Sequence, residues 1–99
     1  MVVIFFKNFN VIMMYVLIIY DINVERINKV YKFLKTYLNW VQNSVFEGEI
    51  TKSQFNIITQ KLKELIDEDT DSVIIYKIPE KYMDKQIIGV EKNPINFIL

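Results

Sequence analysis

The feature that most constrains the fold is the apolar run at residues 15–22, which reads YVLIIYDI. A run this dense in aliphatic and aromatic side chains is typical of a strand that is buried on both faces. The run then meets a carboxylate, Asp21, just before a predicted helix. A buried strand that ends on a charge needs a physical reason, and that reason bears on function.

The composition limits the chemistry that this chain can perform. Its 99 residues predict one domain with one core, near the size at which oligomerisation adds useful burial. It has no cysteine and no histidine, which excludes disulfides, thiolate nucleophiles, a histidine base and zinc or haem sites built from these residues. Twelve Lys and Arg balance twelve Asp and Glu, so the chain as a whole offers no basic field for nucleic acid. A hydrolase with these side chains would most naturally use oxygen ligands and a hard cation such as Mg²⁺.

The apolar N-terminus does not predict a membrane span. Polar residues within 7–10 interrupt it, and the uninterrupted part at residues 11–20 is too short to cross a bilayer. No small-residue cleavage site follows, so we expect no signal peptide and a cytoplasmic location. Residues 1–12 are interpreted as an N-terminal extension, with an upstream start as one explanation, since Met13 and Met14 directly precede the strand.

The first predicted helix has two distinct faces. Asn23 is a good N-cap, and from there to about Tyr37 apolar side chains recur at spacings of three and four, which predicts one buried stripe. The rest of the circumference carries four cations, Arg26, Lys29, Lys32 and Lys35. This face suits a nucleic-acid backbone, although a solvated helix face is the commoner explanation of such a pattern.

A second helix is predicted after a stretch of strand formers. Residues 39–50 predict one long strand or two short ones with a kink near Asn43. Thr51 and Gln54 then form a capping box, in which each side chain bonds to the backbone of the other. This pairing predicts that the helix begins directly after Thr51.

The last third of the chain predicts an acidic turn followed by strands. Residues 67–71 (DEDTD) are interpreted as a solvated turn, because the glycine and glutamate of a calcium-binding loop are missing from the positions that follow. Residues 72–78 predict another buried strand. Apolar runs within residues 86–99 predict an additional C-terminal strand.

The order of these elements predicts the fold class. Strand, helix, one or two strands, helix and strand make an α+β domain at residues 13–99, in a ferredoxin-like β-α-β-β-α-β arrangement with the C-terminal strand in addition. Two helices cover only one face of such a sheet. We therefore expect a homodimer, in which the partner subunit and the C-terminal residues cover the other face.

Asp21 has a functional and a structural interpretation. Functional groups gather at the carboxyl ends of strands in open sheets, and Asp21 lies at such an end. The commoner alternative is that it caps or pairs with N–H groups at the helix start. One carboxylate per chain makes a poor metal site, but a two-fold axis near Asp21 would bring a second one. The composition does not choose between these interpretations.

Three segments together resemble the Cas2 family of CRISPR-associated proteins. They are YVLIIYDI with Arg26 and the lysine-rich helix after it, SVFEGEIT at residues 44–51, and DSVIIYKI at residues 71–78; the resemblance spans residues 14–90. It implies a small ferredoxin-like dimer of the spacer-acquisition machinery. Members are described as metal-dependent endoribonucleases, some of which cut double-stranded DNA. They also bridge dimers of the CRISPR integrase, Cas1, and hold prespacer DNA.

The resemblance also implies roles for particular residues. Asp21 matches the metal-binding aspartate, so the Asp21 pair of two subunits would hold Mg²⁺, which activates water for attack on a phosphodiester. Tyr20, Ser44 and Phe46 match residues associated with activity. Arg26 matches the basic residue at the start of the first helix; an ion pair with Glu25 or a neighbouring acid is an equal alternative for it.

Two functions stay open at this point, with a third less favoured. The first is an Mg²⁺-dependent endonuclease acting on single-stranded RNA or double-stranded DNA, which requires Asp21. The second is a non-catalytic DNA-binding adaptor of the integrase complex, which requires the basic helix and the apolar C-terminal run. The third is a related ribonuclease toxin of the same fold. The near-neutral net charge argues against a strong general nuclease.

Overall fold

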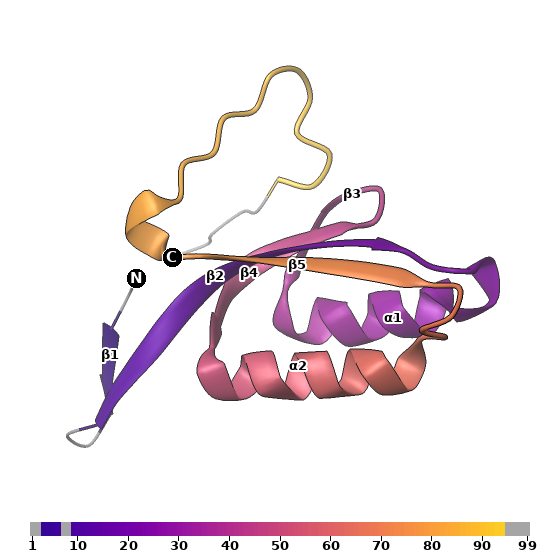
Figure 1. The fold of residues 1–99 in the computed structure, drawn as a ribbon. Coiled ribbons are helices and arrows are strands. Elements are labelled where there is room, and N and C mark those ends of the chain that lie inside the picture. The colour runs from indigo at the N-terminus through magenta and orange to yellow at the C-terminus, as the bar shows by residue number, and fades with distance from the viewer. Residues whose placement is uncertain (1–2, 7–8, 95–99) are drawn as a thin grey trace.

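The computed structural model describes residues 3–6 and 9–94, with side chains from residue 12 onward. From residue 9 to residue 78 the elements follow the predicted order of strand, helix, two strands, helix and strand (Figure 1). Their bounds are Val3–Phe6 (β1), Phe9–Asp21 (β2), Val24–Tyr37 (α1), Asn39–Gln42 (β3), Val45–Thr51 (β4), Lys52–Leu65 (α2), Ser72–Ile78 (β5) and Glu80–Tyr82 (η1, a 3₁₀ helix). Among the helices of these described residues, none has the length and apolar character needed to cross a membrane.

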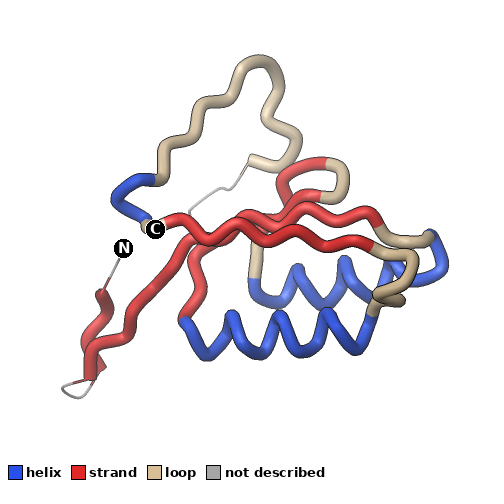
Figure 2. Tube along the Cα trace, in the orientation of Figure 1, coloured by secondary structure: helices blue, strands red, loops and turns tan. Residues whose placement is uncertain are grey.

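β2 is the central strand of an antiparallel sheet. β4 and β5 pair with it, and β3 extends the sheet beyond β4. Both helices pack against the same face, which leaves the opposite face, called the open face below, without a helix (Figures 1 and 2). The prediction of a ferredoxin-like α+β fold is therefore confirmed.

β1 lies outside this ferredoxin-like unit. It pairs with the first residues of β2, from Phe9 to Ile12, before the point where β4 joins at Met13. The hairpin therefore extends β2 beyond the end of the helices (Figure 1). The interpretation of residues 1–12 as an extension of the domain stays a prediction.

Side chains alternate between the two faces of β2. Val16, Ile18 and Tyr20 face the helices and are at most 5 % exposed, whereas Ile19, on the open face, is 38 % exposed. The strand is thus fully buried on one face only. The prediction that both faces are buried is wrong, because no helix among the described residues covers the open face.

The two helices complete the core with the apolar stripes that their spacing predicts. Val30 and Leu34 come from α1, and Ile58 and Leu62 come from α2; none of them is more than 3 % exposed. They pack in one cluster with Phe46 of β4, which is fully buried. Burial of these stripes, more than intrinsic helix propensity, stabilises helices of this length.

Local hydrogen bonds fix both helix starts as predicted. The Asn23 side chain accepts from the Glu25 backbone N–H at 3.3 Å. Thr51 Oγ1 accepts from the Gln54 N–H at 3.1 Å, and Gln54 Oε1 accepts from the Thr51 N–H at 2.9 Å, which completes the capping box. Each cap satisfies N–H groups that have no partner inside the helix.

The predicted kink near Asn43 is a tight turn between two short strands, β3 and β4. Asn43 has a φ of 46°, in the left-handed region that asparagine tolerates better than most residues. The Trp40 indole N–H donates to the Asn43 carbonyl at 2.8 Å across this turn. The two-strand alternative for residues 39–50 is therefore the correct one.

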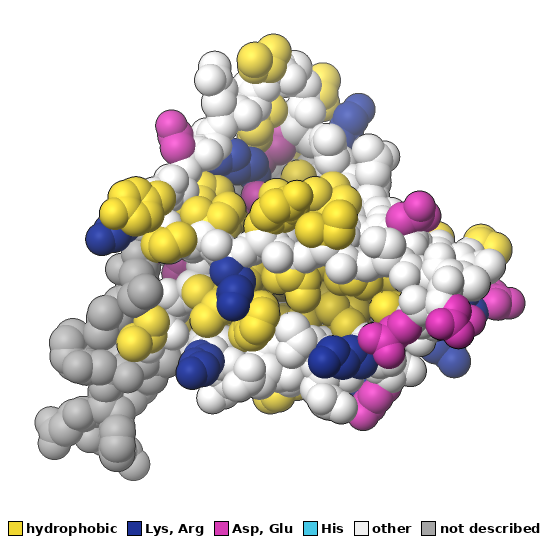
Figure 3. All heavy atoms as spheres, in the orientation of Figure 1, with side chains coloured by type: hydrophobic (Ala, Val, Ile, Leu, Met, Phe, Trp, Pro, Cys, Tyr) yellow, Lys and Arg dark blue, Asp and Glu magenta, His cyan; other side chains and the backbone are white. Residues whose placement is uncertain are grey.

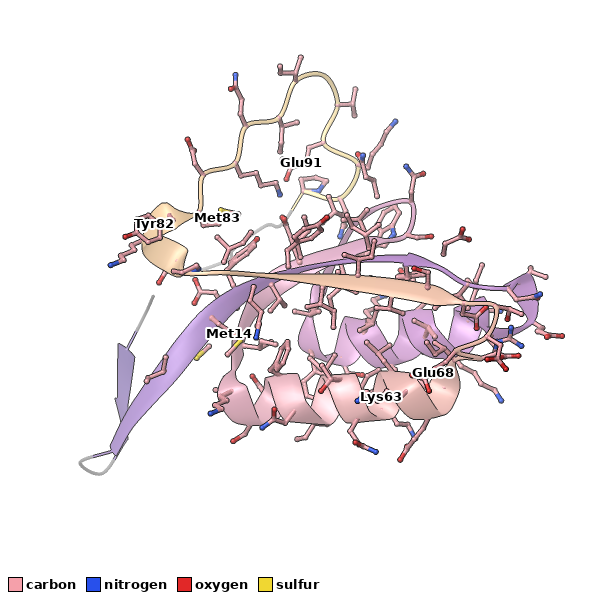
Figure 4. The ribbon with its side chains drawn as sticks, viewed as in Figure 1. Met14, Lys63, Glu68, Tyr82, Met83 and Glu91 are labelled. Carbon is pink, nitrogen blue, oxygen red and sulfur yellow. The ribbon has the colours of Figure 1, made fainter. Side chains whose placement is uncertain are left out.

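The segment after β5 departs most from prediction. After η1, residues 83–94 form an arch over the open face without regular structure (Figures 1 and 2), and Lys85 and Asn93 tie it to Glu47 and to the Trp40 carbonyl. Figure 4 labels Tyr82 at the end of η1, and Met83 and Glu91 along the arch. The predicted C-terminal strand is wrong over residues 86–94, because no described strand pairs with them and a strand needs a partner for its backbone groups. Residues 95–99 lie outside the described residues.

Two neighbouring isoleucines of α2 should differ greatly in how much they contribute to the free energy of unfolding. Ile58 is fully buried, whereas Ile57 is 50 % exposed. We expect Ile58→Ala to lower the free energy of unfolding by about 2–5 kcal/mol, because it removes buried methyl groups and leaves a cavity. Ile57→Ala, the matched control, should cost less than about 1 kcal/mol. Guanidinium unfolding measures both, and equal losses would contradict this assignment of the core.

Candidate functional site

Asp21 lies at an exposed strand end. It is the last residue of β2 and faces Ser72, the first residue of β5. Its neighbours Tyr20 and Ile22 are 5 % and 6 % exposed and point toward the helices, so the alternation of the strand places Asp21 on the open face. Asn23, and not Asp21, caps α1. Among the described residues, none forms a hydrogen bond or ion pair with the Asp21 carboxylate, which leaves it available to a ligand.

Tyr20, Ser44 and Phe46 meet on the other side of this strand end. The Tyr20 ring stacks on Phe46 with centroids 6.2 Å apart, and the Tyr20 N–H donates to the Ser44 carbonyl at 3.1 Å. Burial raises the pKa of the Tyr20 hydroxyl, which the Ser44 side chain partly offsets. The structure therefore brings together three of the residues predicted for catalysis. Because Phe46 is fully buried and Tyr20 nearly so, their rings belong to the core and lie on the opposite face from Asp21.

Arg26 is bound to a buried carboxylate that the sequence interpretation missed. Its Nε donates to Asp71 Oδ2 at 2.7 Å and its Nη2 to Asp71 Oδ1 at 3.1 Å, a bidentate pair. The Asp71 side chain is fully buried, so the prediction of a solvated acidic turn is wrong for this residue. The hydrogen bonds from Arg26 hold the pKa of Asp71 well below its usual range, and Asp71 raises the pKa of Arg26.

The guanidinium of Arg26 has little capacity left for nucleic acid. Besides Asp71, it donates from Nη1 to Glu25 at 2.7 Å and from Nη2 to Thr70 at 3.3 Å. Four of its five N–H groups are therefore engaged. A direct phosphate contact by Arg26 stays a prediction, and its place in the fold is that of a link between α1 and the turn before β5.

The predicted basic face of α1 is exposed, but it lies in the helix layer. Lys29, Lys32 and Lys35 are all exposed on α1, and Lys35 also lies 5.8 Å from the centre of the Tyr31 ring. Asp21, by contrast, is on the open face of the sheet. The lysines therefore lie in the helix layer, and the carboxylate lies on the opposite face of the sheet.

Glu47 lies on the open face but is already paired. Its side chain is 9 % exposed and forms an ion pair with Lys85 of the C-terminal segment. Burial, followed by the charge of Glu47, raises the pKa of Tyr15 to about 12. Glu47 stands opposite Leu17, four residues from Asp21 along β2, or roughly 13 Å at a rise of about 3.3 Å per residue. It is therefore too distant to complete a site at Asp21.

Apolar side chains lie beside Asp21 on the open face. Ile19 pairs with Ile74, and Leu17 pairs with Tyr76, in the ladder between β2 and β5. We call these four residues the open-face patch; Ile74 and Tyr76 are 48 % and 51 % exposed. Figure 3 shows hydrophobic side chains gathered on this side of β5, beneath the arch of the C-terminal segment. Neighbouring apolar side chains in contact with solvent are typical of an interaction surface.

One chain does not supply a complete metal site. No group of three or more acidic, histidine or cysteine side chains that could hold a metal ion occurs among the described residues. Asp21 offers a hard oxygen ligand of the kind that Mg²⁺ prefers, but only one. Asp71 is close in sequence to the partner strand of Asp21, but both of its oxygens are occupied. A cation at Asp21 therefore requires ligands from a second chain, a substrate and water.

Comparisons with known proteins identify close relatives. The family model described as CRISPR associated protein Cas2 matches residues 14–86. A protein named CRISPR-associated endoribonuclease Cas2 from Methanocaldococcus jannaschii is 58 % identical over 87 residues, which is 87 % of this chain and 76 % of that protein. One of the same name from Pyrococcus furiosus is 55 % identical and covers 87 % of this chain and 100 % of that protein. A solved structure titled "Crystal structure of cas2" is 50 % identical, covers 88 % of this chain and 99 % of that one, and has a TM-score of 0.75.

The ion pair of Arg26 and Asp71 predicts a particular dependence of stability on pH. The pKa of Asp71 lies below its ordinary value of 3.8 in the folded chain, so its contribution is complete above that value and is lost as the pH falls toward the folded pKa. We therefore expect Asp71→Asn to destabilise the protein most at pH 7 and progressively less below about pH 4. Urea unfolding at pH 7, 5 and 3 measures this difference.

The control for that series is Asp69→Asn, which removes the same charge from an exposed position in the same turn. Its effect on the free energy of unfolding should be small at every pH. A difference between wild type and Asp71→Asn that grows on acidification would contradict the ion-pair interpretation.

Proposed function

Because this chain belongs to the CRISPR-associated Cas2 family, we propose that it is a cytoplasmic, Mg²⁺-dependent endoribonuclease that works as a homodimer. The relatives reported above are named as endoribonucleases, and the proposal extends that activity to this chain. The observation that carries it is the exposed Asp21 carboxylate at a strand end, which none of the described residues engages.

A homodimer supplies the second carboxylate ligand that a single chain lacks. The open-face patch offers apolar surface to a second copy. Asp21 lies on the same face, two residues after Ile19 on β2. A two-fold axis near this end of the sheet would bring two Asp21 carboxylates together. Two carboxylates with water and substrate oxygens make a suitable ligand set for Mg²⁺. A cation held there would supply an activated water and stabilise the charge that develops on the phosphodiester.

The other residues implied by the family have supporting roles in this proposal. Tyr20 and Phe46 pack beneath the end of β2 and fix the strand from the helix side. Ser44 accepts the backbone hydrogen bond from Tyr20 and so joins the turn between β3 and β4 to the same point. The chain itself therefore holds Asp21 in place, and the reacting water and phosphodiester contact Asp21 and not these rings.

A second candidate is a DNA-binding adaptor of the Cas1 integrase complex. The separation of Lys29, Lys32 and Lys35 from the Asp21 face favours it, because a duplex can lie on the helix layer without reaching the carboxylate. Such binding would come from neutralised phosphates and would weaken with salt. The exposed apolar residues of the C-terminal segment, Ile88 and Val90, would contact the protein partner. This function, unlike cleavage of RNA or duplex DNA, does not need Asp21.

The nuclease proposal predicts a strict requirement for Asp21. With Mg²⁺, the wild-type chain should cleave short single-stranded RNA, and Asp21→Asn should lower the rate at least about 100-fold, because a neutral amide is a poor ligand for the cation. Chelation of the cation should do the same to wild type. Asp69→Asn is the control that removes an exposed carboxylate elsewhere and should keep the wild-type rate.

Duplex DNA assayed in parallel tests the alternative substrate. Cleavage that survives Asp21→Asn, or the absence of any cleavage by wild type, would contradict the nuclease proposal. Either result would make the adaptor the supported function.

The dimer proposal predicts that a charge on the open-face patch separates the subunits. Ile74→Glu should shift the mass measured by light scattering from that of two chains toward one, because a carboxylate would have to lose its water in the apolar contact. Ile57→Glu, at an equally exposed isoleucine on α2, is the matched control and should stay dimeric. A wild type that is monomeric at all concentrations, or an Ile74→Glu variant as dimeric as wild type, would contradict a dimer through this face.

A further inference from the structure

Asp71 is a buried carboxylate whose two oxygens are both engaged. Its side chain is fully buried, and each of its two oxygens accepts two hydrogen bonds. Oδ1 accepts from the Asn23 backbone N–H at 2.9 Å and from Arg26 Nη2 at 3.1 Å. Oδ2 accepts from Arg26 Nε at 2.7 Å and from the Asp67 backbone N–H at 2.9 Å. A carboxylate with four donors in a buried place stays charged and has one geometry.

These four bonds converge on the end of the strand that carries Asp21. Asn23 follows Asp21 by two residues, and Asp71 directly precedes Ser72, which is the ladder partner of Asp21. Asp71 therefore joins the backbone of Asn23, just after Asp21, to the start of β5, where Ser72 pairs with Asp21. Through Arg26 it also ties the first turn of α1 to the same point.

The Asp21 side chain, by contrast, has no partner of its own among the described residues. It occupies the last position of β2, where a ladder would otherwise be free to fray. The position from which its carboxylate extends is therefore set by the backbone around residues 21–23 and by the ladder to Ser72. Whatever holds that backbone decides how well two Asp21 carboxylates converge on one ligand.

We propose that Asp71 is a positioning residue for the Asp21 site, which it holds in the geometry that binds a divalent cation. This inference rests on the proposed function, because it assumes that Asp21 is a metal ligand. Asp71 itself does not contact the cation or the substrate, since its oxygens are buried and occupied. Arg26 acts through the same network, as the donor that keeps Asp71 charged and oriented.

The test measures metal affinity and local backbone protection on the full-length chain. Mn²⁺ serves as the paramagnetic probe in place of Mg²⁺, and its free concentration is read by electron paramagnetic resonance. Hydrogen exchange by mass spectrometry follows the peptide that contains residues 20–24 and, as a reference for global stability, a peptide from the middle of α2. The variants are Asp71→Asn, Arg26→Gln, Asp21→Asn and the charge-matched control Asp69→Asn.

We expect Asp71→Asn to weaken Mn²⁺ binding at least tenfold, and to speed exchange at residues 20–24 at least tenfold more than it speeds exchange in α2, whose rate follows the loss of global stability. Arg26→Gln should shift both readouts in the same direction, and it keeps the test decisive if Asp71→Asn does not fold. Asp69→Asn should match wild type. Wild-type affinity in Asp71→Asn or in Arg26→Gln, or weak binding without faster local exchange, would overturn the proposal.

Failure of the proposed function gives a different pattern. If Asp21→Asn binds Mn²⁺ as tightly as wild type, Asp21 is not a metal ligand, and the metal-binding part of the inference falls with it. The exchange data then decide whether Asp71 holds the end of β2. Unchanged exchange at residues 20–24 in Asp71→Asn would overturn that role as well.

Discussion

The alternation of side chains between the two faces of β2 decides which residues enter the core and which remain outside it. It sends Val16, Ile18 and Tyr20 into the core beneath both helices, where burial of apolar surface stabilises the fold. The same alternation sends Asp21 to the open face, beside Ile19. A shift of the strand by one residue would bury the carboxylate and expose the core, so the packing that folds the chain also fixes where its candidate ligand lies.

A second network secures the point where this strand ends. The core holds β2 from the helix side through Tyr20 and Phe46, while Asp71 and Arg26 hold the backbone that follows it. The apolar contacts set the face on which Asp21 lies, and the buried ion pair sets the path of the chain around it. The proposed site needs both to hold the position of Asp21, because its carboxylate has no partner of its own among the described residues. Such a carboxylate suits a ligand shared across a dimer axis.

The sequence predicted those features that depend on residues close together in the chain. The caps at Asn23 and Thr51, the turn at Asn43 and the apolar stripes of both helices all follow from local chemistry, and they were enough to give the ferredoxin-like order. The pairing of Arg26 with Asp71 joins residues 45 apart, and nothing in either segment specifies the other. The C-terminal strand was wrong for a similar reason, since β-forming residues make a strand only where a partner strand is available. The one signal that sets Asp71 apart from the rest of its acidic turn is its position directly before the strand at residues 72–78.

In the proposed dimer, two Asp21 carboxylates share one cation across a two-fold axis. Native mass spectrometry of the wild-type chain with Mn²⁺ tests it most directly, because it counts the subunits and the metal ions of each species at once. We expect one ion per two chains, and none bound to the Asp21→Asn dimer. One ion per chain, or the same metal content in both proteins, would contradict it.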